Sequence, residues 1–503
     1  MRSILFPVFA GVSVLALAAA ASAANTSVTI NQGVNNSNAH DNVAAVDQSQ
    51  ATPSGTNYDA ITINQDGTYD SVGQIFGWGA VAGVAQIGHG TNAVTITQDS
   101  SSTGATATVT QTAVSGNAAN NATINQGGYS PDATITQTGT PTGTNYATVN
   151  QSNGQYGDGQ QAVIRQGQDG GSSYANGATI NQTSAVMYSG QGAQIRQDGN
   201  HNNATVNQSG DQASASVTQK NAGNNANLTQ QGSTDSATLN QLGSNNQTGG
   251  GLYQTGGQDS LTINQNGSNN TSAGNQSGDQ DSVTVLQTAS NNQSYFTQTH
   301  YQDNATTTQA SNGLITVTQQ GDYGSASVTQ NLSGDEANVT QTGSTDSTTI
   351  TQAGTDTVNL TQNGAQGTAT LSQNGNGNNA NVTQTGYQNV ATTTQASNGS
   401  INLSQQNDYD TATLTQTGSG DQATVTQTGY QDTATTTQAA NGVINLTQSG
   451  SNDTATLTQN ASGEQLTVFQ TGNSDTLSVL QTLAGGQLSI TQAGWNGNIS
   501  VTQ

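Results

Sequence analysis

The stretch ATVTQTGYQDTATTTQ, residues 423–438, decides the fold of this chain. It contains two five-residue segments that end in Gln427 and Gln438, and a short turn separates them. Side chains alternate between the two faces of a β-strand, so Ala423 and Val425 share a face with Gln427, while threonines occupy the other face. The stretch therefore predicts two short strands, each with an inward face that ends in an amide.

The turn between these strands holds Gly429 and Asp432. We expect the glycine to adopt torsions that other residues reach only with strain, and the aspartate to bond to nearby backbone. Most other acids of the chain are single aspartates in similar turns, where they are predicted to act as gatekeepers against premature strand pairing. Ionised aspartates stacked in this way repel one another, so acidification is predicted to speed assembly of the strands.

The same unit recurs through most of the chain. From residue 197 onward, a glutamine ends a strand signal at almost every eleventh residue. Shorter steps of ten follow Gln309, Gln352, Gln395 and Gln438, which are 43 residues apart, so four strand units were duplicated together. Such a fixed period is typical of solenoids. Two units make one rung of about 22 residues, and the predicted fold is an all-β β-solenoid of stacked strand-turn-strand repeats.

Three segments follow from this pattern. Residues 1–23 have a short basic start, an apolar run and a small-residue cleavage site, which predict a signal peptide and a secreted protein. Residues 24–196 carry irregular repeats with longer loops, and residues 197–503 carry regular 11/22-residue repeats. Within the irregular part, residues 33–59 lack the pattern, and residues 66–92 are the most atypical. The strand pattern reaches the last residue, so we expect no capping segment after it.

The composition excludes several classes of protein. Hydrophobic residues make up 30% of the 503 residues, too little for ordinary globular cores, and four prolines are too few for a typical disordered chain. The net charge of −24 argues against a nucleic-acid partner, which needs clustered basic residues. The chain has no cysteine, and its four histidines are scattered. We therefore expect no catalytic, cofactor-binding or metal site, and no enzyme.

The glutamines at the strand ends are predicted to organise the stack. A buried amide without a partner costs a few kcal/mol. In a parallel stack, however, each glutamine lies over the glutamine of the rung below and can bond to it. The predicted self-assembly ladder comprises Gln197, Gln208, Gln230, Gln241, Gln373, Gln384, Gln395, Gln416, Gln427, Gln438, Gln448, Gln459 and Gln503. The predicted turn residues are Gly199, Asn202, Gly386, Asn389, Gly429 and Asp432.

Two functions are compatible with such a stack. Its end rungs expose strand edges that globular proteins cover, so end-to-end self-assembly into a fibre is the first expectation. The alternative is a monomeric β-solenoid that binds ice or adheres to a surface through outward threonine rows, for example Thr413/Thr415 and Thr424/Thr426. Threonine is also a soluble strand former, which would explain the rows without any ligand.

Tyr301, Tyr387 and Tyr430 recur at one turn of the repeat. We expect their rings to cover the sheet edge. Stacking on a sugar is the alternative use of aromatic rings at such a position.

The motif Gln-x-Gly-x-x-Asn/Asp-x-Ala-x-x-x-Gln resembles the curlin repeat of bacterial curli fibre subunits. It occurs at residues 197–208, 230–241, 373–395, 416–427 and 448–459. The resemblance implies a secreted functional amyloid that forms cell-surface fibres for adhesion and biofilm matrix. It also implies an outer-membrane secretion pore and a nucleator subunit as partners, and it implies that the Gln and Asn of the motif stack within the core. The chain departs from that family in its many repeats and its frequent Asp in place of Asn.

Overall fold

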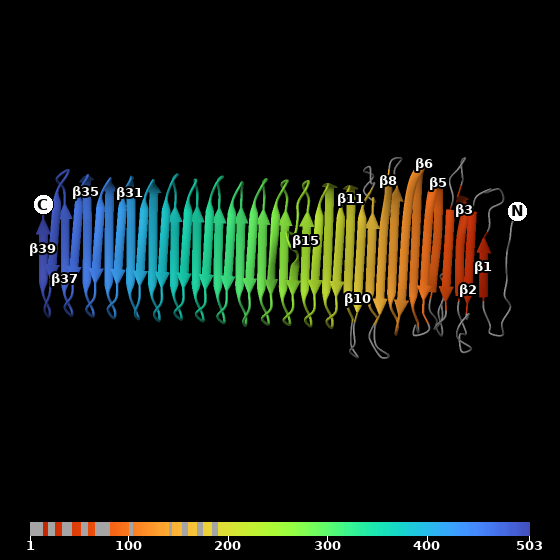
Figure 1. Cartoon of the computed structure of the whole chain (residues 1–503), viewed down its shortest axis with the longest axis horizontal. Coiled ribbons are helices and arrows are strands. Elements are labelled where there is room, and N and C mark those ends of the chain that lie inside the picture. The colour runs from red at the N-terminus through yellow and green to blue at the C-terminus, as the bar shows by residue number, and fades with distance from the viewer. Residues whose placement is uncertain are drawn as a thin grey trace. The chain divides into compact units, whose positions relative to one another are not determined.

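The computed structural model describes residues 14–18, 26–32, 43–51, 59–65, 81–99, 104–139, 143–152, 159–167, 175–183 and 190–503. These residues form strands and turns, and no helix occurs among them, so the described ranges hold no helix that could cross a membrane. The chain divides into two compact units, residues 1–258 and 259–503. Each unit is a parallel β-solenoid, and the chain has about 22 residues per turn (Figure 1). The predicted all-β solenoid and its rung length are confirmed.

Unit 1 contains sixteen strands among its described residues. They are β1 (Val14–Ala18), β2 (Thr26–Gln32), β3 (Val43–Ala51), β4 (Asp59–Gln65), β5 (Val81–Gln98), β6 (Thr106–Gly127), β7 (Asp132–Gly139), β8 (Gly143–Ser152), β9 (Gln161–Gln166), β10 (Gly177–Thr183), β11 (Gly192–Asn200), β12 (Asn203–Gln208), β13 (Ser214–Ala222), β14 (Asn225–Gln230), β15 (Ser236–Gln241) and β16 (Leu252–Gln254).

Unit 2 is described throughout and contains the remaining strands. They are β17 (Ser260–Gln265), β18 (Thr271–Gln276), β19 (Ser282–Gln287), β20 (Gln293–Gln298), β21 (Asn304–Gln309), β22 (Leu314–Gln319), β23 (Ser325–Gln330), β24 (Glu336–Gln341), β25 (Ser347–Gln352), β26 (Thr357–Gln362), β27 (Thr368–Gln373), β28 (Asn379–Gln384), β29 (Val390–Ser397), β30 (Ser400–Gln405), β31 (Thr411–Ser419), β32 (Gln422–Gln427), β33 (Thr433–Ala440), β34 (Val443–Gln448), β35 (Thr454–Ser462), β36 (Gln465–Gln470), β37 (Thr476–Gln481), β38 (Gln487–Gln492) and β39 (Asn498–Thr502).

Strands in unit 2 pair in parallel with the strand two places along the chain, so odd-numbered and even-numbered strands form two separate columns. The register keeps equivalent positions of the repeat opposite one another. In the odd column, β31 pairs with β33, which places Leu414 opposite Thr436 and Gln416 opposite Gln438. The even column follows the same rule, and there Gln405 lies opposite Gln427. One rung is therefore one odd strand, one even strand and the two turns that join them.

Unit 1 begins with a less regular form of the same arrangement. The long strands β5 and β6 pass through both columns, and β5 pairs with both β3 and β4. The prediction that residues 33–59 are irregular is wrong in part, because β3 lies within them and pairs with β1. The glutamines of β3, Gln48 and Gln50, are not followed by the Gln-x-Gly turn of the repeat motif, so the motif did not reveal this strand. The predicted signal peptide lies outside the described residues, except for β1.

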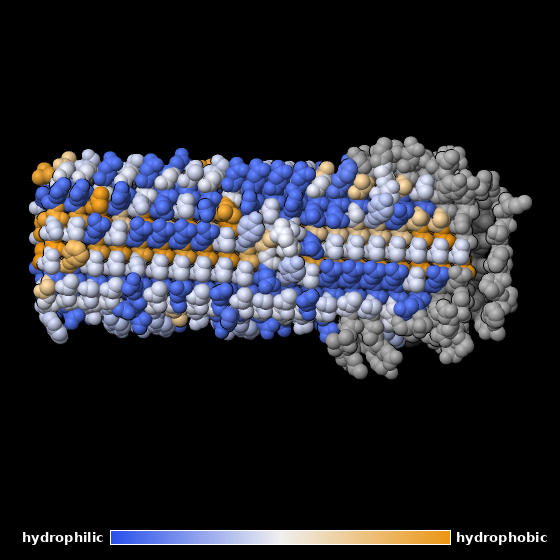
Figure 2. Space-filling model, viewed as in Figure 1, coloured by the Kyte–Doolittle hydropathy of each residue, from blue (hydrophilic) through white to orange (hydrophobic). Residues whose placement is uncertain are grey.

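The inward face of each column contains the apolar residues and the final glutamine of each strand. In β32, Ala423, Val425 and Gln427 are buried, while Thr424 is exposed and Thr426 is half-buried. This confirms the alternation that the sequence predicts. Outward residues of equivalent strands lie side by side, and Figure 2 shows that hydrophilic side chains in each unit form rows across the strands.

Several inward positions of the core hold hydroxyl residues in place of apolar ones, and two of these hydroxyls have no hydrogen-bond partner. Thr393 and Thr436 occupy the place that Leu414 fills between them, and each is only 1% exposed. Neither hydroxyl oxygen has a hydrogen-bond partner. A buried hydroxyl without a partner is unfavourable, so these threonines weaken the core where they occur.

Replacement of one of these threonines by valine should stabilise the fold. The Thr436→Val variant removes an unbonded hydroxyl and keeps the branched shape of the side chain, so we expect the free energy of unfolding to rise by about 1 kcal/mol. Urea denaturation followed by circular dichroism measures the change. The matched control is Thr435→Val on the outward face, which should change stability little; a Thr436→Val variant no more stable than this control contradicts the assignment.

Candidate functional site

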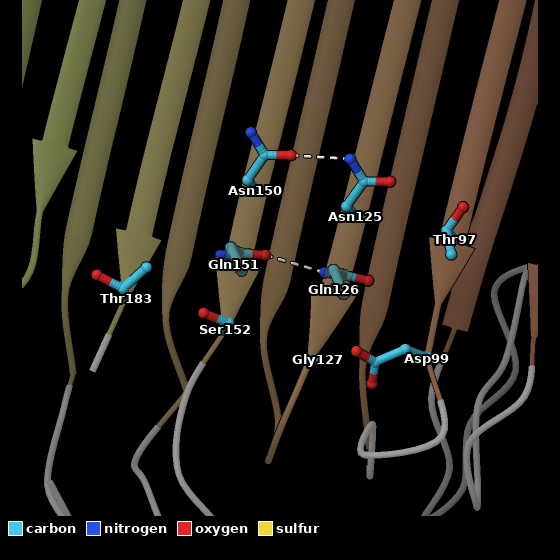
Figure 3. A pocket seen from close by; sticks show the side chains of 9 residues that line it. All are labelled: Thr97, Asp99, Asn125, Gln126, Gly127, Asn150, Gln151, Ser152 and Thr183. Atoms are coloured by element: carbon cyan, nitrogen blue, oxygen red, sulfur yellow. Dashed lines mark hydrogen bonds between the residues drawn. The ribbon is translucent and has the colours of Figure 1, made fainter. Parts of the chain in front are cut away.

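The strand-end glutamines of each unit form two continuous ladders of side-chain hydrogen bonds, one in each column. Each Nε2 donates to the Oε1 of the glutamine in the next rung, over 2.7–3.1 Å in unit 1 and 2.8–3.3 Å in unit 2. Figure 3 shows one step, from Gln126 to Gln151 at 3.0 Å. Each of these glutamines is buried, apart from Gln503, which is half-buried.

Each amide also connects the two columns. The Nε2 of Gln427 donates to the Oε1 of Gln448 at 3.0 Å and to the backbone oxygen of Thr411, the first residue of the facing strand, at 3.1 Å. Its own Oε1 accepts a hydrogen bond from Gln405 at 2.9 Å. Both polar atoms are therefore satisfied, so that the amide adds bonds to the core without leaving an unpaired group. The same glutamine side chain therefore joins one rung to the next and joins one column to the other.

Glutamines that follow one another in the sequence belong to different ladders. In unit 1, the odd ladder contains Gln86, Gln111, Gln137, Gln166, Gln197, Gln219 and Gln241, and the even ladder contains Gln98, Gln126, Gln151, Gln182, Gln208, Gln230 and Gln254. In unit 2, the predicted ladder residues Gln373, Gln395, Gln416, Gln438, Gln459 and Gln503 lie in the odd ladder, and Gln384, Gln427 and Gln448 lie in the even ladder.

The ladders extend beyond the predicted residues, and Gln254 is one member that the repeat pattern did not indicate. Gln254 ends the three-residue strand β16 and accepts the amide of Gln230 at 2.9 Å. The surrounding sequence is rich in glycine and gives no clear strand signal. The eleven-residue step counted backward from Gln265 falls on Gln254, and this is the signal that could have found it.

The Asn or Asp that precedes each strand forms a second inward column. Asn202, Asn389 and Asp432 are 0–2% exposed. The Oδ1 of each accepts the backbone N–H of the equivalent residue in the next rung; for Asp432 this donor is Asp453 at 3.0 Å, and for Asn389 it is Asp410 at 2.9 Å. The carboxylates at this position are therefore buried and join successive rungs, and the gatekeeper role that the sequence suggests for turn aspartates stays a prediction.

The turn glycines are required for space rather than for torsion. A Cβ on Gly429 would overlap the backbone oxygen of Gly450 in the next rung, and a Cβ on Gly386 would overlap that of Asn407. Neither glycine has a left-handed φ, so the torsion that we expected there is wrong. The left-handed residue of each of these turns is Gln388 or Gln431, with φ of 57° and 59°.

Gly199 combines both properties. Its φ is 125°, and a Cβ there would overlap the backbone of Asn221. The sequence motif identified these glycines correctly as fixed positions, but it could not reveal the close approach of the next rung, which exists only after stacking.

Burial raises the pKa values of the column aspartates. The pKa of Asp432 rises to about 7, because its carboxylate is removed from water and faces Asp410 and Asp453; the backbone N–H groups of Asp453 and Gly429 oppose this rise. Burial likewise raises the pKa of Asp303 to about 7 and that of Asp410 to about 6. The column thus stacks groups that resist ionisation when folded.

The outward faces of the two columns differ in unit 2. In the odd column, Thr392, Thr413 and Thr435 lie in register, and their partners two residues later do the same, so two threonine rows run side by side. Thr424 and Thr426, which we expected to belong with them, lie in the even column. The row that contains Thr424 also contains asparagines that bond to one another, from Asn338 through Asn359 and Asn381 to Asn402, at 3.0 Å per step.

A shallow depression lies in unit 1 at the ends of β5, β6, β8 and β10 (Figure 3). Its lining includes Asn125 and Asn150, which bond to each other at 2.8 Å, and the ladder residues Gln126 and Gln151. The side chains of these four residues bond to one another in pairs. No group of three or more His, Cys, Asp or Glu residues that could hold a metal ion occurs in the described part of the chain.

These contacts define the class of protein. It is a parallel β-solenoid whose rungs are held together by ladders of buried amides. The curlin associated repeat matches residues 192–220, which cover β11, β12 and most of β13, and residues 356–386, which cover β26 to β28. The chain thus contains curlin associated repeats, with one match in each unit. No curated protein matches it.

The buried aspartates predict a protein that is more stable in acid. The pKa of Asp432 is raised from 3.8 to about 7, so the folded chain holds this proton more tightly than the unfolded chain does. The resulting stabilisation is complete below about pH 4 and is lost as the pH rises to about 7. We expect the urea midpoint, followed by circular dichroism, to fall across this range.

The Asp432→Asn variant tests whether the buried carboxylate causes the pH dependence of stability. It keeps the acceptor oxygen and removes the charge, as Asn389 does naturally in the same column. It should be more stable than the parent near neutral pH and depend less on pH, whereas Thr435→Asn on the outward face, which removes no carboxylate, should leave the pH dependence unchanged. A parent protein whose midpoint rises with pH over this window would rule out the buried column as the main titrating group.

Proposed function

We propose that the chain is a secreted structural protein that self-assembles into curli-like amyloid fibres on the cell surface, where the fibres serve adhesion and the biofilm matrix. The single observation that carries this proposal is the translational symmetry of the ladders. Each rung donates an amide to the next rung and accepts one from the previous rung, through the same atoms, along each unit. A rung from a second copy can therefore continue the pattern without any new kind of contact.

The register of this stack does not depend on matching apolar side chains. Leu414 lies opposite Thr436, and Thr436 lies opposite Leu457, while the glutamines of these strands remain paired. The amides and the backbone thus set the alignment, and the apolar residues fill whatever space remains. This supports assembly between rungs of different sequence, including rungs that belong to different copies.

The family resemblance supports the remaining parts of the proposal. The resemblance implies a secreted, cell-surface location. It also implies an outer-membrane secretion pore and a nucleator subunit as partners. The net charge of −24 is consistent with a fibre that does not bind nucleic acid. The predicted signal peptide at residues 1–23 belongs to the same proposal.

A second candidate function rests on the threonine rows of unit 2. Thr413/Thr415 and Thr435/Thr437 lie on neighbouring strands of the odd column and repeat with the spacing of a β-sheet, which is about 4.8 Å. A flat, regular array of hydroxyl and methyl groups could bind ice or another ordered surface in a monomeric solenoid. Thermal hysteresis from protein that remains monomeric would favour this candidate.

Replacement of ladder glutamines should slow assembly more than replacement of outward threonines. The double variant Gln384→Leu, Gln427→Leu leaves Gln362 and Gln405 without their acceptors and Gln448 without a donor. Each buried polar atom left unpaired costs about 1–3 kcal/mol. We expect slower growth and a longer lag in thioflavin fluorescence, with fibres followed by electron microscopy and with parental seeds added to separate elongation from nucleation.

The matched control is the double variant Thr424→Ser, Thr426→Ser on the outward face of the same strand. It should assemble at close to the parental rate. Equal slowing in both variants would mean that the amide ladder does not organise the fibre, and a parent protein that stays monomeric after long incubation would remove the fibre proposal itself.

A further inference from the structure

Tyrosine rings meet in two clusters at one edge of unit 2. Tyr387, Tyr409 and Tyr430 lie in three successive rungs, with ring centroids 5.6 Å and 5.5 Å apart. Tyr301 and Tyr323 form a second cluster, at 5.5 Å. In each contact the rings meet edge to face, at interplanar angles of 75–82°. The sequence pattern singled out three of these residues but not Tyr323 or Tyr409, which complete the contacts.

The tyrosines of successive rungs occupy different positions in their turns, and this brings the rings together. Tyr387 is the third residue after a ladder glutamine, whereas Tyr409 is the fourth. The backbone N–H of Tyr409 donates to the oxygen of Tyr387 at 2.8 Å, and the N–H of Tyr387 donates to the Oδ1 of Asp408 at 2.8 Å. These bonds fix the two turns against each other, so the rings meet through a defined backbone frame.

The same frame occurs at the second cluster, 86 residues earlier. Tyr323 donates its N–H to the oxygen of Tyr301 at 2.8 Å, and Tyr301 donates to Asp322 at 3.2 Å. Both Tyr323 and Tyr409 have a φ of 62°, a left-handed conformation that is strained for a bulky side chain. Equivalent turns have Gln, Asn, Thr or Ser at this position with a similar φ, so the turn imposes this conformation whatever the residue. The same turn backbone at both clusters presents the ring of Tyr323 or Tyr409 to the tyrosine of the neighbouring rung.

The rings remain open to solvent although they touch. Tyr409 is 38% exposed, Tyr430 is 43% exposed and Tyr323 is 51% exposed. An oxidant can thus reach the phenols, and each exposed ring has room to rotate toward its neighbour. The chain contains no cysteine, so neither a disulfide nor a competing thiol is present.

We propose that these clusters are sites of oxidative modification, at which neighbouring tyrosines of successive rungs become joined as dityrosine. The oxidant is hydrogen peroxide acting through a peroxidase. Each phenol loses one electron and one proton from its hydroxyl group, which leaves a phenoxyl radical with spin density on the ring carbons next to the C–O carbon. The two electrons and two protons reduce the peroxide O–O bond and yield two water molecules.

Coupling then requires only the two radicals. A carbon–carbon bond forms between one such carbon on each ring, which leaves each ring as a dienone. The hydrogen on each joined carbon then moves as a proton to the carbonyl oxygen of its own ring and restores the aromatic phenol. The overall reaction consumes two tyrosines and one hydrogen peroxide and gives one dityrosine and two waters. The product ties one rung to the next covalently, at a turn where the described structure has only hydrogen bonds and ring contacts.

The experiment compares tyrosines of similar exposure within one molecule. Tyr253 is 41% exposed but makes no ring contact with another aromatic residue among the described residues. The full chain, at low concentration, is treated briefly with hydrogen peroxide and a peroxidase, and dityrosine fluorescence is recorded. Aspartate-specific cleavage then precedes mass spectrometry, because a chain with four basic residues gives too few tryptic fragments.

We expect cross-linked peptides that have lost two hydrogens and that join Tyr387 or Tyr430 to Tyr409, and Tyr301 to Tyr323. The Tyr409→Phe variant keeps the ring but cannot form the radical, and it leaves Tyr387 and Tyr430 about 10 Å apart, two strand spacings. It should lose the first set of peptides and retain the second. The Tyr323→Phe variant should do the reverse, so each variant controls for the folding of the other.

Three results would overturn the proposal. One is that Tyr253 enters cross-links as often as the clustered tyrosines do. Another is that the yield rises with protein concentration, which indicates coupling between molecules. The third is that Tyr409→Phe leaves the peptides of Tyr387 and Tyr430 unchanged, in which case the rings only cover the sheet edge.

Discussion

The buried glutamine amide is the interaction on which the rest of the structure depends. The side chain of Gln427 bonds to the rung before it, to the rung after it and to the backbone of the facing strand. A single such amide in an apolar core would be unfavourable, whereas a continuous column of them leaves no donor or acceptor unpaired. The stack therefore gains from each added rung in the same way, which distinguishes it from a globular core that closes on itself. Alanine, valine, leucine and isoleucine fill the slab between the ladders, but they do not set its alignment.

The carboxylate column acts against this stabilisation at neutral pH. Asp410, Asp432, Asp453 and Asp475 follow one another in successive rungs, and each accepts a backbone N–H from the next. Asparagine makes the same bond without charge, as Asn389 does, and glycine at Gly497 still provides the N–H donor. The column thus accommodates Asp, Asn and Gly, because all three residues provide the same backbone N–H donor. The side chain decides only whether the stability of the rung changes with pH. Aspartate makes the stack sensitive to pH where asparagine would not.

Much of the fold could be predicted from periodicity, and the errors share one cause. The alternation of Ala423, Val425 and Gln427 and the 22-residue rung follow from local spacing, which one strand is enough to display. Gly429 was assigned to torsion, and Asp432 to a bond within its own turn, because the contacts that explain them come from the next rung and not from neighbours in sequence. Strand β3 and Gln254 escaped the pattern because the sequence around them gives no clear strand signal, although the column pairs them normally. The role of the ladders in assembly remains a prediction, since a single chain can satisfy every bond described here.

The steps between stacked glutamines of unit 2 have two lengths. Gln405 and Gln427 are 22 residues apart, whereas Gln395 and Gln416 are 21 residues apart, and both pairs bond at normal distances. The turns absorb the missing residue, and the strands do not shift. Insertions and deletions within the turns are therefore structurally neutral, and gain or loss of whole 43-residue blocks changes the number of rungs without disturbing those that remain. Such a gene can vary in length between lineages by simple recombination while the protein keeps the same cross-section.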